Sequence, residues 1–263
     1  MYDYHTHSSF SADSDEPLET MVRQAISRGI KEYAVTDHYD PNYRNELYNA
    51  EFDLASYTRE LERIERKYGA KIRLRKGLEI GIQHDVTEDC IAMTGAYPFD
   101  FIIGSFHCAE GFEICDPAYL QDRTAEELYR GFYGYMLQCL KIYKDYDVLG
   151  HLNVLDRYVD RIPEDAAYCD IAEDIVRLLV EDGKGIEINT SSFRYGMGER
   201  TTPTADMLRL YARMGGEIVT IGSDAHRARD VGFLYDRAVR MLRDAGLKYL
   251  ATFENREVRF VKP

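Results

Sequence analysis

Tyr2-Asp3-Tyr4-His5-Thr6-His7 is the stretch on which the predicted fold depends, because a short strand runs directly into two histidines. Side chains two positions apart in an extended segment point to the same face, so His5 and His7 can bind one metal ion together. An isolated His-x-His is more often part of an ordinary polar surface. The rest of the chain decides between these interpretations, since six of its seven histidines follow strand-like runs.

The same order of strand, polar loop and helix recurs along the chain. Further strands are predicted over residues 33–36, 72–78, 99–104, 146–150, 185–191 and 217–221. Helices are predicted over residues 18–26, 54–68, 125–143, 171–179, 204–214 and 231–242. Alternating strands and helices favour a parallel sheet, and ligand-type residues at the strand ends require those ends to converge, as they do in a barrel. We therefore expect an α/β fold, a distorted (β/α)7 TIM-like barrel, with a closing hairpin over residues 249–261.

The composition restricts the class of protein. A chain of 263 residues with 45% hydrophobic and 30% charged content fits one domain over residues 1–263. A net charge of −13 without a basic run opposes nucleic-acid binding, whereas a cluster of divalent cations needs nearby carboxylates. Five widely spaced cysteines favour a reducing compartment, and no segment resembles a leader or a membrane span. We expect a cytoplasmic protein with no nucleic-acid or membrane partner.

The chain carries more metal-binding capacity than one ion needs. The ligand-type residues at or near the predicted strand ends are His5, His7, Asp13, His38, Glu79, His107, His151, Asp224 and His226. Nine such groups predict two or three divalent ions, zinc, manganese or iron, with Glu79 able to bridge two of them. Singly, His151 can be a core histidine, Glu79 a helix cap and Asp13 an Asx turn, but their repetition favours a metal site. Asp37 is expected to orient His38 without binding metal.

Six motifs carry these residues in a fixed order. They are His5-Thr6-His7, Asp37-His38, Gly77-Leu78-Glu79, Ser105-Phe106-His107, Gly150-His151-Leu152-Asn153 and Ser223-Asp224-Ala225-His226. Over nearly the whole chain they resemble the polymerase-and-histidinol-phosphatase (PHP) family of metal-dependent phosphoesterases, which implies a three-metal site in a distorted β/α barrel. By this resemblance the first metal takes His5, His7, Glu79 and Asp224, the second takes Glu79, His107 and His151, and the third takes Asp13, His38 and His226. Asp13 stands where some members have histidine.

Within the family, the chain is most similar to the histidinol-phosphate phosphatases. The similar stretches are Glu187-Ile188-Asn189-Thr190-Ser191, the following Arg194, and Arg157-Tyr158. Ser192-Phe193 occupies the place of an expected glycine-containing turn. Because arginine donates planar, charge-assisted hydrogen bonds to phosphate, Arg157 and Arg194 are predicted to bind the substrate. The alternative for both arginines is a surface ion pair.

The resemblance implies hydrolysis of L-histidinol phosphate to L-histidinol and phosphate, a step in histidine biosynthesis. A metal-bridging hydroxide would attack phosphorus in line, and Asp224 or His226 would assist proton transfer. Three alternatives stay open: a PHP phosphoesterase for another small phosphate ester such as a nucleotide, amidohydrolase chemistry on the same type of barrel, and an interaction module without metals. Amidohydrolases would not need the third ligand set in addition to Glu79.

Overall fold

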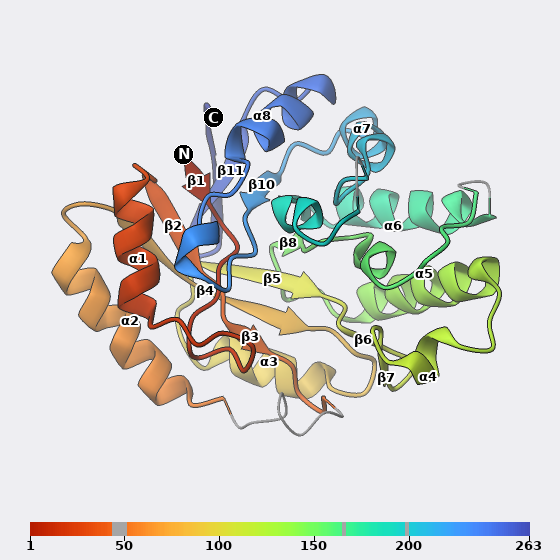
Figure 1. Cartoon of the computed structure of the whole chain (residues 1–263), viewed down its shortest axis with the longest axis horizontal. Coiled ribbons are helices and arrows are strands. Elements are labelled where there is room, and N and C mark those ends of the chain that lie inside the picture. The colour runs from red at the N-terminus through yellow and green to blue at the C-terminus, as the bar shows by residue number, and fades with distance from the viewer. Residues whose placement is uncertain (44–51, 165–166, 198–199) are drawn as a thin grey trace.

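Parallel strands curve into a barrel in the computed structural model, which describes residues 1–43, 52–164, 167–197 and 200–263 (Figure 1). The barrel strands are β1 (Tyr2–Asp3), β2 (Glu32–Val35), β3 (His38–Tyr39), β4 (Arg73–Gly81), β5 (Phe101–Ser105), β8 (Val148–Leu149), β9 (Gly185–Asn189) and β10 (Val219–Gly222). Their order is β1-β2-β4-β5-β8-β9-β10, and β3 pairs with β4 beyond the end of β2. Tyr4 N donates to Ile221 O at 2.9 Å, which joins the first strand to the last. Because β2 and β3 pair with successive parts of the same strand, they fill one position, and the predicted seven-stranded α/β barrel is confirmed.

Helices surround the outside of this sheet (Figure 1). They are α1 (Leu18–Ser27), α2 (Leu54–Tyr68), α3 (Thr87–Gly95), α4 (Pro117–Leu120), α5 (Ala125–Ile142), α6 (Cys169–Glu181), α7 (Ala205–Arg213) and α8 (Tyr235–Asp244). Residue types that favour helix N-termini cap two of these helices. Asp53 accepts a hydrogen bond from Ser56 N at 2.9 Å at the start of α2, and Thr124 forms a capping box with Glu127 at the start of α5. Among the described residues, no helix combines the length and apolar character that a bilayer crossing requires.

Helix α8 begins at Tyr235, four residues after its predicted start. Val231 is fully buried, so the apolar spacing continues through residues that are not helical. Leu234 has a φ of 48°, in the left-handed region, and a right-handed helix cannot pass through that conformation. Short elements were also missed, namely α3, α4 and the hairpin of β6 (Cys108–Ala109) with β7 (Phe112–Glu113).

The predicted C-terminal hairpin is confirmed as β11 (Leu250–Glu254) and β12 (Glu257–Val261), which pair antiparallel. Asn255 and Arg256 form its turn with φ values of 51° and 66°, as a tight hairpin turn requires. Arg256 Nε donates to Asp147 Oδ2 at 2.6 Å, next to the start of β8. The hairpin therefore covers the amino-terminal ends of the strands, and the carboxyl ends remain for the site.

Candidate metal centre

Glu79 lies at the middle of a cluster of imidazoles at the carboxyl ends of the strands. Its Oε2 lies 3.0 Å from His5 Nε2 and 3.4 Å from His7 Nε2. Its Oε1 lies 2.9 Å from His151 Nε2 and 3.3 Å from His107 Nε2. Strand β4 is paired on both sides, to β3 and β5, which fixes the position of Glu79 within it. One carboxylate thus contacts two groups of imidazoles, as expected for a bridging ligand.

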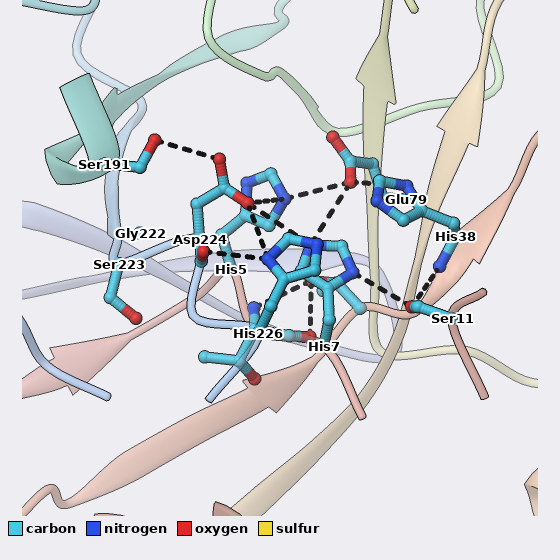
Figure 2. Close-up of polar contacts among 12 residues, drawn as sticks. His5, His7, Ser11, His38, Glu79, Ser191, Gly222, Ser223, Asp224 and His226 are labelled. Atoms are coloured by element: carbon cyan, nitrogen blue, oxygen red, sulfur yellow. Dashed lines mark hydrogen bonds and ion pairs between the residues drawn. The ribbon is translucent and has the colours of Figure 1, made fainter. Parts of the chain in front are cut away.

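Asp224 faces Glu79 from the end of β10, on the other side of the rings of His7 and His226 (Figure 2). Its Oδ1 lies 3.5 Å from His7 Nε2 and 3.8 Å from His5 Nε2. The rings of His7 and His226 are stacked with centroids 4.0 Å apart. The first predicted ligand set is therefore brought together by β1, β4 and β10.

The third predicted set lies nearer to solvent. Asp13 Oδ2 is 3.0 Å from His226 Nε2 and 3.6 Å from His38 Nε2. The side chains of these three residues are 19–30% exposed, whereas Glu79 is fully buried. All nine predicted ligand residues thus converge on one region, and the outer set is the most accessible.

The donor atoms of this cluster fit bound metal ions. Several buried imidazole nitrogens face a carboxylate oxygen 3.0–3.4 Å away, but without the geometry of a hydrogen bond. Among the described residues, the buried atoms without a hydrogen bond include His5 Nε2, His7 Nε2, His38 Nδ1, Glu79 Oε2 and His226 Nε2. A buried polar atom without a partner costs about 1–3 kcal/mol, so a group that satisfies several of them at once is expected here. Overlapping groups of three donors lie within 4.8 Å of one another. Imidazole and carboxylate donors without thiolate suit zinc, manganese or iron.

In two imidazoles of the cluster, the ring nitrogen that points away from Glu79 lies against a carboxylate that is not one of the nine predicted ligands. His5 Nδ1 lies 2.7 Å from Glu187 Oε1, and His107 Nδ1 lies 2.7 Å from Asp40 Oδ1. Burial opposes the charged form of both rings, but the carboxylates beside them, Glu79 included, outweigh burial. The pKa of His5 therefore lies well above its ordinary value, and the pKa of His107 rises to about 9. Neither Glu187 nor Asp40 was identified as a site residue from the sequence.

Asp37 acts through a serine. Its Oδ1 accepts from Ser8 N and from Ser11 Oγ, both at 2.6 Å. Ser11 Oγ in turn accepts from His38 N at 3.1 Å and lies 3.1 Å from His7 Nδ1. Asp37 therefore holds the backbone of His38, through Ser11, and not the His38 ring. The imidazole ring that Asp37 helps to orient is that of His7, again through Ser11. Burial and neighbouring imidazoles hold the pKa of His7 well below its ordinary value, which favours the neutral, metal-binding form.

Both predicted arginines contact Asp224. Arg157 Nη2 donates to Ser191 Oγ at 2.6 Å and to Asp224 Oδ2 at 3.2 Å, and its side chain is only 6% exposed. Arg194 Nη2 donates to the Asp224 carbonyl at 2.7 Å. The surface ion pair considered as an alternative is therefore wrong for Arg157, which pairs in the interior. Arg157 Nε and Arg194 Nη1 are buried without a partner among the described residues.

A pocket of about 300 Å³ opens over the cluster. His107, His151 and Asp224 line it together with Arg157, and Glu113, Tyr158 and Tyr195 form other parts of its wall. Tyr195 is 52% exposed, and its ring lies 4.7 Å from the Arg157 guanidinium. The volume suits a small molecule that reaches the metal ligands and an arginine at the same time.

The chain is similar to known proteins over nearly its full length. The PHP domain model matches residues 3–191. The histidinol-phosphatase of Lactococcus lactis subsp. lactis (strain IL1403) is 32% identical over 97% of this chain and 95% of its own. A probable histidinol-phosphatase of Clostridium acetobutylicum is 28% identical over 99% of each chain. The chain belongs to the PHP domain family, as its motifs predicted.

Solved structures agree with this assignment. The crystal structure of histidinol phosphate phosphatase from Lactococcus lactis, complexed with zinc, L-histidinol and phosphate, superposes with a TM-score of 0.90 at 30% identity and covers 98% of both chains. A putative histidinol phosphatase from Listeria monocytogenes gives a TM-score of 0.75 at 20% identity, over 90% of this chain and 99% of its own, which shows a shared fold alone.

Proposed function

We propose that this chain is a phosphoric monoester hydrolase that converts L-histidinol phosphate to L-histidinol and phosphate in histidine biosynthesis. The observation that carries the proposal is a metal-ligand cluster around Glu79 beside two arginines with unpaired, buried N–H groups. Full-length similarity to the Lactococcus lactis histidinol-phosphatase supports the choice of substrate. We assign the activity to one barrel domain, residues 1–263, located in the cytoplasm, with a small phosphate ester and neither nucleic acid nor membrane as partner.

Two or three divalent ions fit the cluster, with zinc as the first choice because the Lactococcus lactis structure contains it. Manganese and iron suit the same donors. The proposed ligands are His5, His7, Glu79 and Asp224 for one ion, Glu79, His107 and His151 for a second, and Asp13, His38 and His226 for a third. Such ions, when bound, lower the pKa of water and offset the charge of a phosphate.

Arg157 and Arg194 are proposed to bind the phosphate. Arg157 Nε and Arg194 Nη1 can each donate to a phosphate oxygen, since their other nitrogens are already held by Asp224 and Ser191. Asn189 Oδ1, 3.4 Å from Arg157 Nη2, adds to this support. Arginines fixed before the substrate arrives lose little conformational entropy on binding, so they stabilise the charge that spreads over the oxygens in the transition state.

We assign proton transfer to the pair Asp224 and His226. Asp224 Oδ1 faces His5 and His7, and Oδ2 accepts from Arg157, so both oxygens of this carboxylate are engaged. His226 lines the pocket and is 21% exposed at its side chain. With the first two sites filled and the third empty, these contacts favour His226 as the group that would pass a proton to the leaving alcohol.

Selectivity for the leaving group must come from the pocket wall, because metal ions and arginines contact the phosphate that every phosphomonoester carries. Glu113 contributes a carboxylate to this wall, and Tyr195 contributes an exposed ring. A carboxylate and an aromatic face suit the amine and the imidazole of histidinol. A nucleoside monophosphate has a neutral leaving group, which would gain no ion pair with Glu113.

The deciding experiment measures phosphate release by zinc-loaded protein from a panel of histidinol phosphate, a nucleoside monophosphate and a sugar phosphate. We expect the highest kcat/KM for histidinol phosphate. Much faster hydrolysis of another ester would refute the substrate and favour a different PHP phosphoesterase. No phosphate release from any ester, with zinc bound, would refute the reaction class.

A further inference from the structure

Glu187 lies directly behind the metal-ligand cluster and belongs to none of the proposed ligand sets. It stands in β9 and is 1% exposed. Its Oε1 lies 2.7 Å from His5 Nδ1, on the side of the ring that points away from Glu79. Its Oε2 accepts from His151 N at 3.0 Å and from Asn189 Nδ2 at 3.1 Å. One carboxylate therefore holds the ring of one proposed ligand and the backbone of another.

The charge of Glu187 has no ordinary counter-ion. Among the described residues, the one ion-pair partner of Glu187 is His5, and no lysine or arginine pairs with it. A carboxylate buried away from water is costly unless positive charge lies near it. Within the described part of the chain, that charge reaches Glu187 through His5, whose Nε2 faces the cluster. The geometry is that of a carboxylate–histidine–metal series, in which the outer carboxylate fixes the tautomer of the ring and raises its strength as a ligand.

We propose that Glu187 is a positioning residue for the metal centre, which keeps the proton of His5 on Nδ1 and holds His5 and His151 in register. The inference rests on the proposed metal-dependent function and adds a residue that the ligand sets do not contain. Glu187 touches neither the pocket nor the phosphate-binding arginines among its described contacts. Its effect should therefore appear in metal affinity before it appears in substrate binding.

Gly222 supplies a second, steric approach to the same contact. A Cβ at this position would lie 2.0 Å from Glu187 Oε1 and 2.4 Å from the Cβ of His5. Both distances are far below van der Waals contact, so any side chain here would displace both Glu187 and His5 from their present positions. Gly222→Ala should therefore disturb the contact between Glu187 and His5 while all the proposed ligands stay in the chain, although it also moves His5 itself.

The test is the zinc dissociation constant of Glu187→Gln, measured by competition with a chromophoric chelator, together with the melting temperature of the metal-free protein. Glutamine keeps the size and removes the charge. We expect affinity at the tightest site to fall by about 10- to 100-fold, the range typical for loss of an outer partner of a ligand. The metal-free melting temperature should fall as well, because the raised pKa of His5 leaves a buried ion pair with Glu187 that the variant loses, so the deciding comparison is with a control that loses another buried ion pair. Gly222→Ala should lower the affinity in the same direction.

The matched control is Glu32→Gln. Glu32 is also about 2% exposed, but it pairs with Arg75 at 2.8 Å near the start of β2, away from the cluster. This change should lower the melting temperature and leave zinc affinity unchanged. In a His5→Gln background, Glu187→Gln should add less than a twofold effect on affinity, because the His5 ring is gone and the amide oxygen of glutamine can still accept from His151 N.

Wild-type affinity in both Glu187→Gln and Gly222→Ala would overturn the role of Glu187. An equal loss of affinity in Glu187→Gln and Glu32→Gln would also overturn it, since the effect would then follow from general destabilisation. If the wild-type protein itself binds no zinc, manganese or iron, the proposed function fails, and that result is distinct from either outcome for the variants.

Discussion

Replacing Arg157 with alanine should lower kcat/KM by roughly thirtyfold for every phosphomonoester that the protein hydrolyses. The magnitude follows from one N–H: Nη2 is already held by Ser191 and Asp224, and Nε is the buried donor without a partner. One hydrogen bond to a charged group contributes about 2 kcal/mol, and each 1.36 kcal/mol is a tenfold change in rate. Lysine at this position keeps the charge but has no planar fork, so Arg157→Lys should recover only part of the loss.

The assay compares kcat/KM for histidinol phosphate and for an aryl phosphate with zinc-loaded protein. Both substrates should lose activity by the same factor, since Arg157 contacts the group that they share. Arg130→Ala is the matched control, because Arg130 is 43% exposed and pairs with Asp170 on the surface, where such pairs contribute about 0–1 kcal/mol. A loss under threefold in Arg157→Ala, or a loss for histidinol phosphate alone, would refute the role in phosphate binding.

Three further predictions address the metal centre and the reaction. Glu79→Gln should lower bound metal and turnover together, because Glu79 contacts imidazoles through both oxygens, and full activity at unchanged stoichiometry would contradict this. Zinc binding at pH 7.5 should release protons, and zinc affinity should rise as the pH increases toward 9. The reason is that the metal-free protein holds a proton on His107, whose pKa is about 9, and an imidazole must lose this proton before it binds metal. Calorimetry in buffers of different ionisation enthalpy measures the number of protons released. Hydrolysis of a chiral phosphate should invert configuration, as one in-line displacement requires, and retention would indicate a phosphoenzyme.

The convergence of the nine residues could be predicted from the sequence because most of them lie at or just after the end of a strand, and the ends of parallel barrel strands meet. His107 and His151, for example, needed only local patterns to be identified. Glu187 and Asp40 could not be identified in this way, because each acts on a histidine from another strand, and register between distant strands is a property of the folded barrel. A carboxylate two positions after His38 was the one local signal for Asp40.

The ends of some helices and strands were also predicted wrongly, because they depend on contacts between residues that are distant in the sequence. Apolar periodicity reports which residues face the core, and Val231 faces it from an irregular segment, so α8 was extended too far. In β4, pairing with β3 and β5 carries the strand past Glu79 to Gly81, although the sequence suggested an end before Glu79. Pairing partners decide where a strand stops, and they are distant in sequence.

Closure of the barrel between β1 and β10 also bears on synthesis of the protein. Asp3 accepts from Ser223 N at 2.9 Å across a separation of 220 residues, and His5 and Asp224 meet at the same seam. On the ribosome, β1 emerges long before its second neighbour exists, so one of its edges stays unpaired through most of translation. Contacts at this sequence distance form late because of the entropy of closing so long a loop. A nascent chain that ends before β10 has neither a closed barrel nor Asp224 and His226, so metal capture is delayed until most of the protein has been made.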